Sequence, residues 1–227
     1  MYIWRKLTPE ARARMLEQRV RNQVPWRVPP LWECGHRHYL LTAACYEHLP
    51  IIGVTEERMN AFEDAILESL EPVVSQIVAW VLLPNHYHVL VSGDDVQRMR
   101  KTLGLLHGRT SRQWNLEDTR PARRVFHGSA ETYMKSDRHL SATLNYIHHN
   151  PVKHRYVEKW TDWKWSSATA FLEEHGRETT AHLWKEYPID DYGNDWDPVG
   201  TPVGVPASAG SKTFTPLIKN REEPPTR

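Results

Sequence analysis

The sequence predicts an α+β fold built on a ferredoxin-like antiparallel sheet with helices on one face. Three observations support this prediction. Short β-branched and aromatic runs recur between residues 36 and 92, and apolar residues recur at helical spacing in residues 55–70 and 96–114. In chain order these segments follow the pattern β, α, β, β, α, β, which is typical of ferredoxin-like domains.

The first two elements lie in residues 36–70. A run of Tyr, Leu and Thr favours a strand over residues 36–45. Residues 55–70 are predicted to form a helix, because Thr55 is suited to cap its N-terminus and apolar residues recur on one helical face. These apolar residues are Met59, Phe62, Ile66 and Leu70.

A hairpin, a second helix and a last strand follow. Residues 76–83 are rich in Val, Ile and Trp and favour a strand, Pro84 and Asn85 a turn, and residues 86–92 the returning strand. We then expect a helix over residues 96–114 and a short edge strand over residues 123–127.

A last long helix is predicted over residues 137–149, with Asp137 as its N-cap. Since Pro151 disfavours helical geometry in the residue before it, this helix should end near Asn150. A stripe of three apolar residues should face the sheet, and a short helix should follow over residues 168–174. The stripe consists of Leu140, Leu144 and Ile147.

The chain divides into three parts by composition. Residues 1–32 form a basic N-terminal arm, which either contacts DNA or binds a partner. Residues 33–175 hold the predicted sheet and helices, and we expect them to form the central domain, which carries the candidate site. Residues 176–227 form a C-terminal extension that becomes rich in Pro, Gly and acidic residues beyond about Tyr187, and we expect it to be largely irregular.

Length and composition exclude several classes of protein. The 227 residues, 40% of them hydrophobic, suit one domain with extensions. No apolar run is long enough to span a membrane, and the N-terminus has no apolar signal core. The two cysteines lie outside any Cys-x-x-Cys pattern. We therefore expect a protein of the reducing cytoplasm with no membrane partner.

Positive charge is concentrated in the middle of the chain. Between positions 97 and 164 the sequence has 14 Lys and Arg residues against 6 Asp and Glu, although the whole chain carries only +1. Such a segment suits a phosphate backbone, while a solvated basic face is the alternative. The candidate DNA contacts are Arg98, Arg100, Lys101, Arg109, Arg112, Arg123, Arg124 and Lys153.

Two histidines supply half of a candidate metal site. His86 and His88 are two residues apart in a predicted strand, so both imidazoles project from one face. On the last helix, Tyr146 and Asn150 are four residues apart and share another face. We expect Tyr146 to be exposed in a cleft because it lies away from the apolar stripe. If the two elements pack together, a metal held by neutral ligands would meet a tyrosine hydroxyl.

Three ordered motifs resemble one family. They are Leu-Pro-Asn-His-Tyr-His-Val-Leu at residues 83–90, Tyr-Ile-His-His-Asn-Pro-Val-Lys at residues 146–153, and Trp-Lys-Trp-Ser-Ser at residues 163–167. Together they are similar to the Y1 (HUH) transposase family, in its branch of REP-associated tyrosine transposases. The resemblance covers about residues 38–172.

The resemblance implies an HUH nuclease fold that binds hairpin-forming single-stranded DNA and uses a divalent metal, Mg or Mn. It implies that Tyr146 attacks a backbone phosphate, leaving a 5′-phosphotyrosine link and a free 3′-hydroxyl. By motif position, His86 and His88 match the metal-binding pair and Asn150 the third ligand. Other branches often have Gln at the position of Asn150, which is one methylene longer.

Several alternatives stay open. Tyr133 and Tyr156 are other candidate nucleophiles, although neither is followed by an amide four residues later. The chain could bind hairpin nucleic acid without cutting it, or it could be a histidine-metal hydrolase of small molecules. Both a monomer and a homodimer are compatible with the sequence.

Overall fold

The computed structural model describes residues 37–189, together with residues 8 and 192. The predicted N-terminal arm, apart from residue 8, and the chain beyond residue 192 lie outside the described residues.

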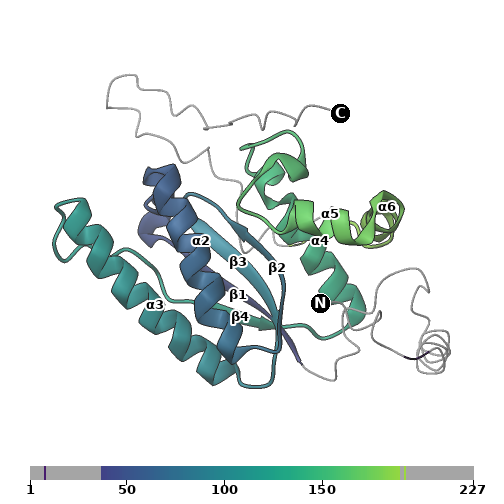
Figure 1. The fold of residues 1–227 in the computed structure, drawn as a ribbon, viewed down its shortest axis with the longest axis horizontal. Helices are drawn as coiled ribbons and strands as arrows, with labels where there is room; N and C mark the ends of the chain where they lie inside the picture. Colours follow the sequence, from purple (N-terminus) through teal and green to yellow (C-terminus); the bar gives the residue numbers. More distant parts are fainter. Residues whose placement is uncertain (1–7, 9–36, 190–191, 193–227) are drawn as a thin grey trace.

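Four antiparallel strands form one sheet, in the order β2 (Gln76–Leu82), β3 (His86–Ser92), β1 (His38–Ala44) and β4 (Ala130–Tyr133). Helix α2 (Glu56–Leu70) connects β1 to β2, and α3 (Val96–Glu117) connects β3 to β4. The predicted chain order and the ferredoxin-like α+β class are thereby confirmed. Figure 1 shows α2 and α3 side by side across one face of the sheet.

The face covered by α2 and α3 is the one that carries Tyr87. The Tyr87 ring packs edge-on against Phe62 of α2, and its hydroxyl lies 2.9 Å from Nε2 of His107 on α3. Burial lowers the pKa of His107 to about 4, so this imidazole is neutral at pH 7. Thr55 caps α2 as predicted, since its hydroxyl accepts from the Arg58 amide at 3.1 Å.

A further helix, α4 (Asp137–Lys153), lies against the opposite face of the sheet, next to β2 and β3. The prediction of helices on one face only was therefore incomplete. Every residue of β3 is buried, so both faces of this central strand need a covering layer. The predicted apolar stripe of α4 provides part of that layer, because Leu140, Leu144 and Ile147 are all buried.

The prediction that residues 123–127 form the fourth strand of the sheet was wrong. Residues around Phe126 make only an isolated bridge with Cys45, beyond the end of β1. The fourth strand is β4, whose sequence Ala-Glu-Thr-Tyr has no apolar run and could not be recognised by its pattern. It pairs with Tyr39 to Thr42 of β1.

Both predicted ends of α4 needed correction. Ser136, not Asp137, is the N-cap, and its hydroxyl accepts from the His139 amide at 3.2 Å. The helix runs past Pro151 to Lys153, because the His154 amide still reaches the Asn150 carbonyl at 3.0 Å. Pro151 removes one hydrogen bond of the ladder and is itself buried.

The chain after α4 returns to the edge of the sheet. Ser167 pairs with Trp80 of β2 through backbone and side-chain hydrogen bonds of 3.0 Å. The indoles of Trp163 and Trp165 donate to the Leu82 carbonyl and to Asn60, at 2.9 and 2.8 Å. These tryptophans therefore anchor the C-terminal segment on the core.

Two further helices pack beside α4, α5 (Ala168–His175) and α6 (Arg177–Glu186). The predicted irregular extension thus begins with a helix. The buried residues Thr180, Leu183 and Tyr187 lie three and four positions apart and form its inner face. Asn145 of α4 donates to the carbonyls of Leu183 and Tyr187, at 3.2 and 2.8 Å.

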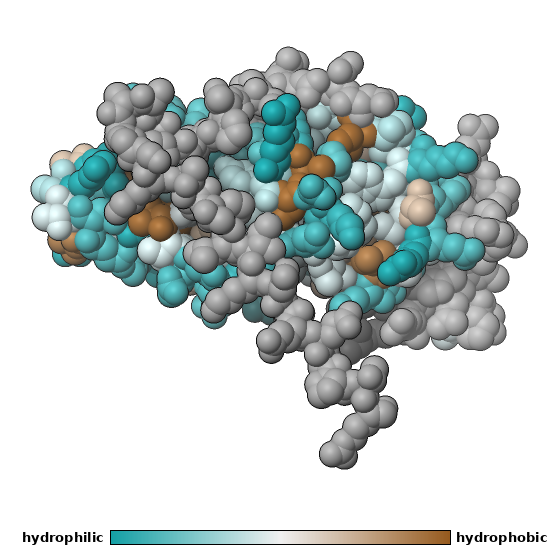
Figure 2. Space-filling view, turned by 90° about the horizontal axis from the view of Figure 1, so that it is seen from above, coloured by the Kyte–Doolittle hydropathy of each residue, from teal (hydrophilic) through white to brown (hydrophobic). Residues whose placement is uncertain are grey.

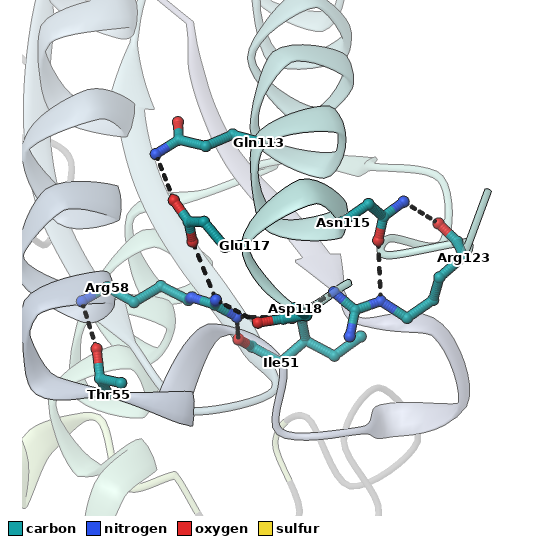
Figure 3. Close-up of polar contacts among 8 residues, drawn as sticks. All are labelled: Ile51, Thr55, Arg58, Gln113, Asn115, Glu117, Asp118 and Arg123. Carbon is teal, nitrogen blue, oxygen red and sulfur yellow. Dashed lines mark hydrogen bonds and ion pairs between the residues drawn. The ribbon is translucent and has the colours of Figure 1, made fainter. Parts of the chain in front are cut away.

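An ion-pair cluster joins the start of α2 to the end of α3 (Figure 3). Arg58 donates through both terminal nitrogens to the Asp118 carboxylate, at 2.6 and 3.1 Å. Arg123 donates to the same carboxylate at 2.7 Å and to Asn115 at 3.0 Å. These contacts lower the pKa of Asp118 to about 2, chiefly through the Arg58 hydrogen bonds.

None of the helices in the described part of the chain is long and apolar enough to cross a bilayer. On the face shown in Figure 2, hydrophilic residues dominate the described surface, and hydrophobic residues occur in small separate patches.

Candidate active site

The turn between β2 and β3 holds the candidate site in place. The Leu83 amide donates to the His86 carbonyl at 2.8 Å and closes the hairpin. The segment that follows β1 holds the same turn from outside, because Cys45 donates to the Asn85 carbonyl at 2.7 Å and Gly53 to the Pro84 carbonyl at 2.9 Å. The backbone that leads into His86 is therefore supported from two sides.

Asn85 determines which nitrogen of His86 carries the proton. The Asn85 amide nitrogen donates to the His48 carbonyl at 3.2 Å, which leaves its oxygen 2.8 Å from Nδ1 of His86. Nδ1 therefore donates a proton to that oxygen, and in the Nδ1–H tautomer Nε2 has the lone pair that a metal needs. Glu47 and His48 both adopt left-handed φ angles, of 54° and 53°, in the turn that presents this carbonyl.

His88 is held in a similar way by β1. Thr42 lies directly opposite His88 in the sheet, and its hydroxyl oxygen is 2.8 Å from Nδ1. Nε2 of His88 points toward α4 and lies 3.5 Å from the Tyr146 hydroxyl. The imidazoles of His86 and His88 are 5.1 Å apart between ring centroids. Both rings thus have a supporting partner on Nδ1 and direct Nε2 toward the same helix.

Helix α4 brings Tyr146 and Asn150 to this pair. The Asn150 side-chain oxygen lies 3.2 Å from Nε2 of His86, and the Tyr146 ring is 5.3 Å from the His88 ring. The prediction that Tyr146 is exposed in a cleft was wrong, because only 1% of its surface is accessible. The ammonium of Lys153 lies 5.1 Å from the centre of its ring, and Tyr192 packs edge-on at 5.8 Å.

The donor set fits a divalent cation. Nε2 of His86 lies 3.2 Å from the Asn150 oxygen, so in the tautomer with the proton on Nδ1 both atoms could bind the same cation. The hydrogen bonds that Nδ1 of His86 makes with Asn85 and that Nδ1 of His88 makes with Thr42 are the kind of support that orients metal-binding histidines. Within the described residues, no group of three or more His, Cys, Asp or Glu side chains could form a different metal site.

The structure also brings residues to the site that the sequence reasoning did not name. Thr42 and Asn85 support the two imidazoles. His154 lies one helical turn after Asn150, and its ring centroid is 5.1 Å from that of His86, as close as His88 is. The four-residue spacing that links Tyr146 to Asn150 extends to His154 and was the signal that could have found it.

The predicted DNA contacts lie in several different places. Lys153 lies at the site, next to Tyr146. Arg123 is engaged by Asp118, and Arg124 lies over the Tyr46 ring. The others are exposed on α3, the helix that covers the opposite face of the sheet, so the structure does not bring them to the histidine pair. They are Arg98, Arg100, Lys101, Arg109 and Arg112, and their role in DNA binding stays a prediction.

The alternative tyrosines are placed differently from Tyr146. Tyr133 is exposed on β4 and packs against Tyr39. Tyr156 packs between His154 and Trp163, with ring centroids 6.4 and 5.3 Å away. Tyr146 is the tyrosine whose hydroxyl faces the histidine pair. A ferredoxin-like sheet that presents two histidines to a helical tyrosine is the arrangement that the resemblance to Y1 transposases implied.

Comparison with known proteins identifies the family. No family model matches the chain. A protein of Haemophilus influenzae (strain Rd), named as a REP-associated tyrosine transposase, is 31% identical over 48% of this chain and 68% of that protein. A solved structure of a REP-associated tyrosine transposase bound to a REP hairpin aligns with a TM-score of 0.47 and 19% identity, over 79% of this chain and 94% of that chain. The chain belongs to the family of REP-associated tyrosine transposases.

Proposed function

We propose that this protein is a metal-dependent single-stranded DNA endonuclease and strand transferase that acts at hairpin DNA, of the REP type, in the cytoplasm. One observation carries the proposal. The Tyr146 hydroxyl and the Asn150 oxygen meet the Nε2 atoms of His88 and His86, from segments 58 and 64 residues apart in sequence. The name of the Haemophilus relative, a REP-associated tyrosine transposase, supports the choice of DNA from REP elements as the partner.

The chemistry is assigned to the side chains as follows. His86, His88 and Asn150 would hold a divalent ion, Mg or Mn, which would polarise a phosphoryl oxygen as a Lewis acid. The Tyr146 oxygen attacks the phosphorus, the bond from phosphorus to the 3′-oxygen breaks, and the proton that Tyr146 loses is taken up, through solvent, by the 3′-oxygen. The 3′-oxygen leaves as a hydroxyl, and the 5′-phosphate stays bound to Tyr146. Lys153, next to the Tyr146 ring, stabilises the negative charge on that oxygen and on the phosphate.

Strand transfer follows from the same link. Because the phosphotyrosine bond keeps the energy of the broken phosphodiester, a 3′-hydroxyl from another strand can attack it and release Tyr146. No external energy source is needed.

The test compares the unsubstituted protein with Tyr146→Phe. Labelled hairpin DNA is incubated with each protein and Mg or Mn, and covalent adducts are separated on a denaturing gel. We expect an adduct and a free 3′-hydroxyl only with Tyr146 present, and hairpin binding by both proteins. Full cleavage by Tyr146→Phe would contradict the assignment. Hydrolysis of small molecules by a protein that does not cleave DNA would favour the alternative of a histidine-metal hydrolase.

A second function is favoured by the burial of Tyr146. With 1% of its surface accessible, the side chain must become more exposed before its oxygen can meet a phosphate. A protein that binds hairpins and no longer cuts them has no need for that change. Tight hairpin binding by the unsubstituted protein, with no adduct in either metal, would select this alternative.

A further inference from the structure

An aromatic and basic cluster lies beside the candidate site and has no part in the chemistry above. The Arg124 guanidinium carbon is 4.9 Å from the centre of the Tyr46 ring. The His127 ring is 5.0 Å from the same ring, at an interplanar angle of 37°. Arg124 and His127 are exposed, and Tyr46 is half-buried. We call Tyr46, Arg124 and His127 the Tyr46 cluster.

The sheet register places the Tyr46 cluster on the same face as the histidine pair. Ala44 lies directly opposite His86 in β1 and β3. On its other side Ala44 accepts a hydrogen bond from the His127 amide at 2.9 Å, next to the bridge between Cys45 and Phe126. Directly opposite residues of antiparallel strands share a face, so His86, Ala44 and His127 project to one side.

The distance between the two sites suits a nucleic acid strand. Neighbouring strands are about 4.8 Å apart, so the Cα atoms of His86 and His127 are separated by about 10 Å across Ala44. That span is about one to two nucleotides of an extended strand, which can reach about 7 Å per nucleotide, twice the 3.4 Å of a stacked duplex. Ala44 is partly exposed and presents only a methyl group between them.

Charge also favours a nucleic acid at this place. Arg123, next in sequence, is engaged by Asp118 and Asn115. Arg124 is different, because its Nε donates to the Phe126 carbonyl at 3.3 Å and no carboxylate of the described residues pairs with it. The Phe126 contact holds the guanidinium over Tyr46 and leaves its charge available to a phosphate.

We propose that Tyr46, Arg124 and His127 form a stacking subsite for one unpaired nucleobase, next to the phosphate bound at His86 and His88. This inference rests on the proposed function, because it takes single-stranded DNA as the ligand. Flat aromatic rings and a guanidinium bind any base through its π-face, so the subsite binds a base without selecting its identity. It distinguishes an unpaired strand from a duplex, whose bases are already stacked.

The experiment measures equilibrium binding by fluorescence anisotropy in the Tyr146→Phe background, where DNA stays uncut. One probe is a hairpin with single-stranded arms on both sides, and the other is the same hairpin without arms. We expect Tyr46→Ala to weaken binding of the armed hairpin by about 5- to 150-fold, the range for loss of one stacked base, and binding of the armless hairpin by less than about twofold.

Two further variants separate stacking from folding. Tyr46→Phe keeps a flat ring and should bind the armed hairpin within about twofold of the parent protein. Tyr46→Leu keeps apolar volume without a flat ring, and should lose nearly as much affinity as Tyr46→Ala. If Tyr46→Leu binds as tightly as the parent, or if Tyr46→Ala weakens both probes equally, the stacking subsite is refuted.

An abasic scan of the arms identifies the base. One abasic position should weaken binding by the parent protein and have no further effect in Tyr46→Ala, because both changes remove the same contact. If no position behaves in this way, the proposal is wrong. If the Tyr46 effect holds but the unsubstituted protein forms no covalent adduct, the cleavage assignment fails and the subsite stands. If neither hairpin probe binds, both the proposed function and the stacking subsite are refuted.

Discussion

The hydrogen bond between Thr42 and His88 leads to a prediction about metal affinity. When Nε2 of His88 binds the ion, Nδ1 carries the proton and donates it to the Thr42 hydroxyl, 2.8 Å away. Thr42→Val keeps the shape of the side chain and removes that acceptor, so the buried Nδ1 loses its partner. Loss of such a supporting contact weakens metal binding by about 10- to 100-fold, or about 1.4–2.7 kcal/mol.

The assay is calorimetric titration of Mn into the full chain without DNA, which keeps the result independent of cleavage. Thr42→Ser retains the hydroxyl and should bind Mn within about threefold of the parent protein. Thr132→Val makes the same substitution on the neighbouring strand β4 and should leave the affinity unchanged. Parent-like affinity for Thr42→Val, or an equal loss in Thr42→Ser, would show that the hydroxyl does not support His88.

Two further predictions concern the framework around the site. Asp118→Asn should lower the free energy of unfolding at pH 7 by about 1–2 kcal/mol, allowing for solvent screening, while Glu68→Gln on the exposed side of α2 changes it little. Because folding lowers the pKa of Asp118 to about 2, the stabilisation by its carboxylate is full above about pH 4 and fades as the pH falls toward 2. Urea titrations of both proteins at several pH values would measure this change. A stability difference that does not depend on pH would contradict the prediction. Gly53→Ala would place a Cβ 2.4 Å from the Pro84 Cβ, so we expect the free energy of unfolding, measured by urea titration, to fall by about 1–3 kcal/mol. Mn binding should weaken as well. Gly128→Ala is the control, because its Cβ would meet no atom within 4 Å. Equal stability of the two glycine variants would refute the role of Gly53 in holding the turn.

Much of the fold was predictable because the spacing of apolar residues along the sequence indicates which face of a helix or strand is buried. The four apolar residues predicted on α2 are all buried, and the hairpin turns at Pro84 and Asn85 as expected. The strand β4 was missed because an edge strand of Ala, Glu, Thr and Tyr is stabilised by its neighbour, not by its own pattern. Helix α4 passed its predicted end because packing outweighed the one hydrogen bond that Pro151 removes.

The candidate site also has parts that the sequence predicted and parts that it did not. The spacing of His86 and His88 predicts two imidazoles on one face of the sheet. The structure has both rings on one face, with their centroids 5.1 Å apart. The spacing of Tyr146 and Asn150 likewise predicts a shared helical face, and both side chains lie against the histidines. The supporting residues could not be predicted in this way, because Thr42 reaches His88 only through strand pairing.

By itself, the sequence determined which side chains lie together within one element, because a strand repeats every two residues and a helix about every four. It also determined the family, through three motifs in order. Only the tertiary structure decided that α4 lies on the face opposite α2 and α3, that Tyr146 is buried, and that the exposed arginines of α3 lie away from the histidine pair. These features depend on packing between elements far apart in the chain, and local periodicity carries no information about which elements meet.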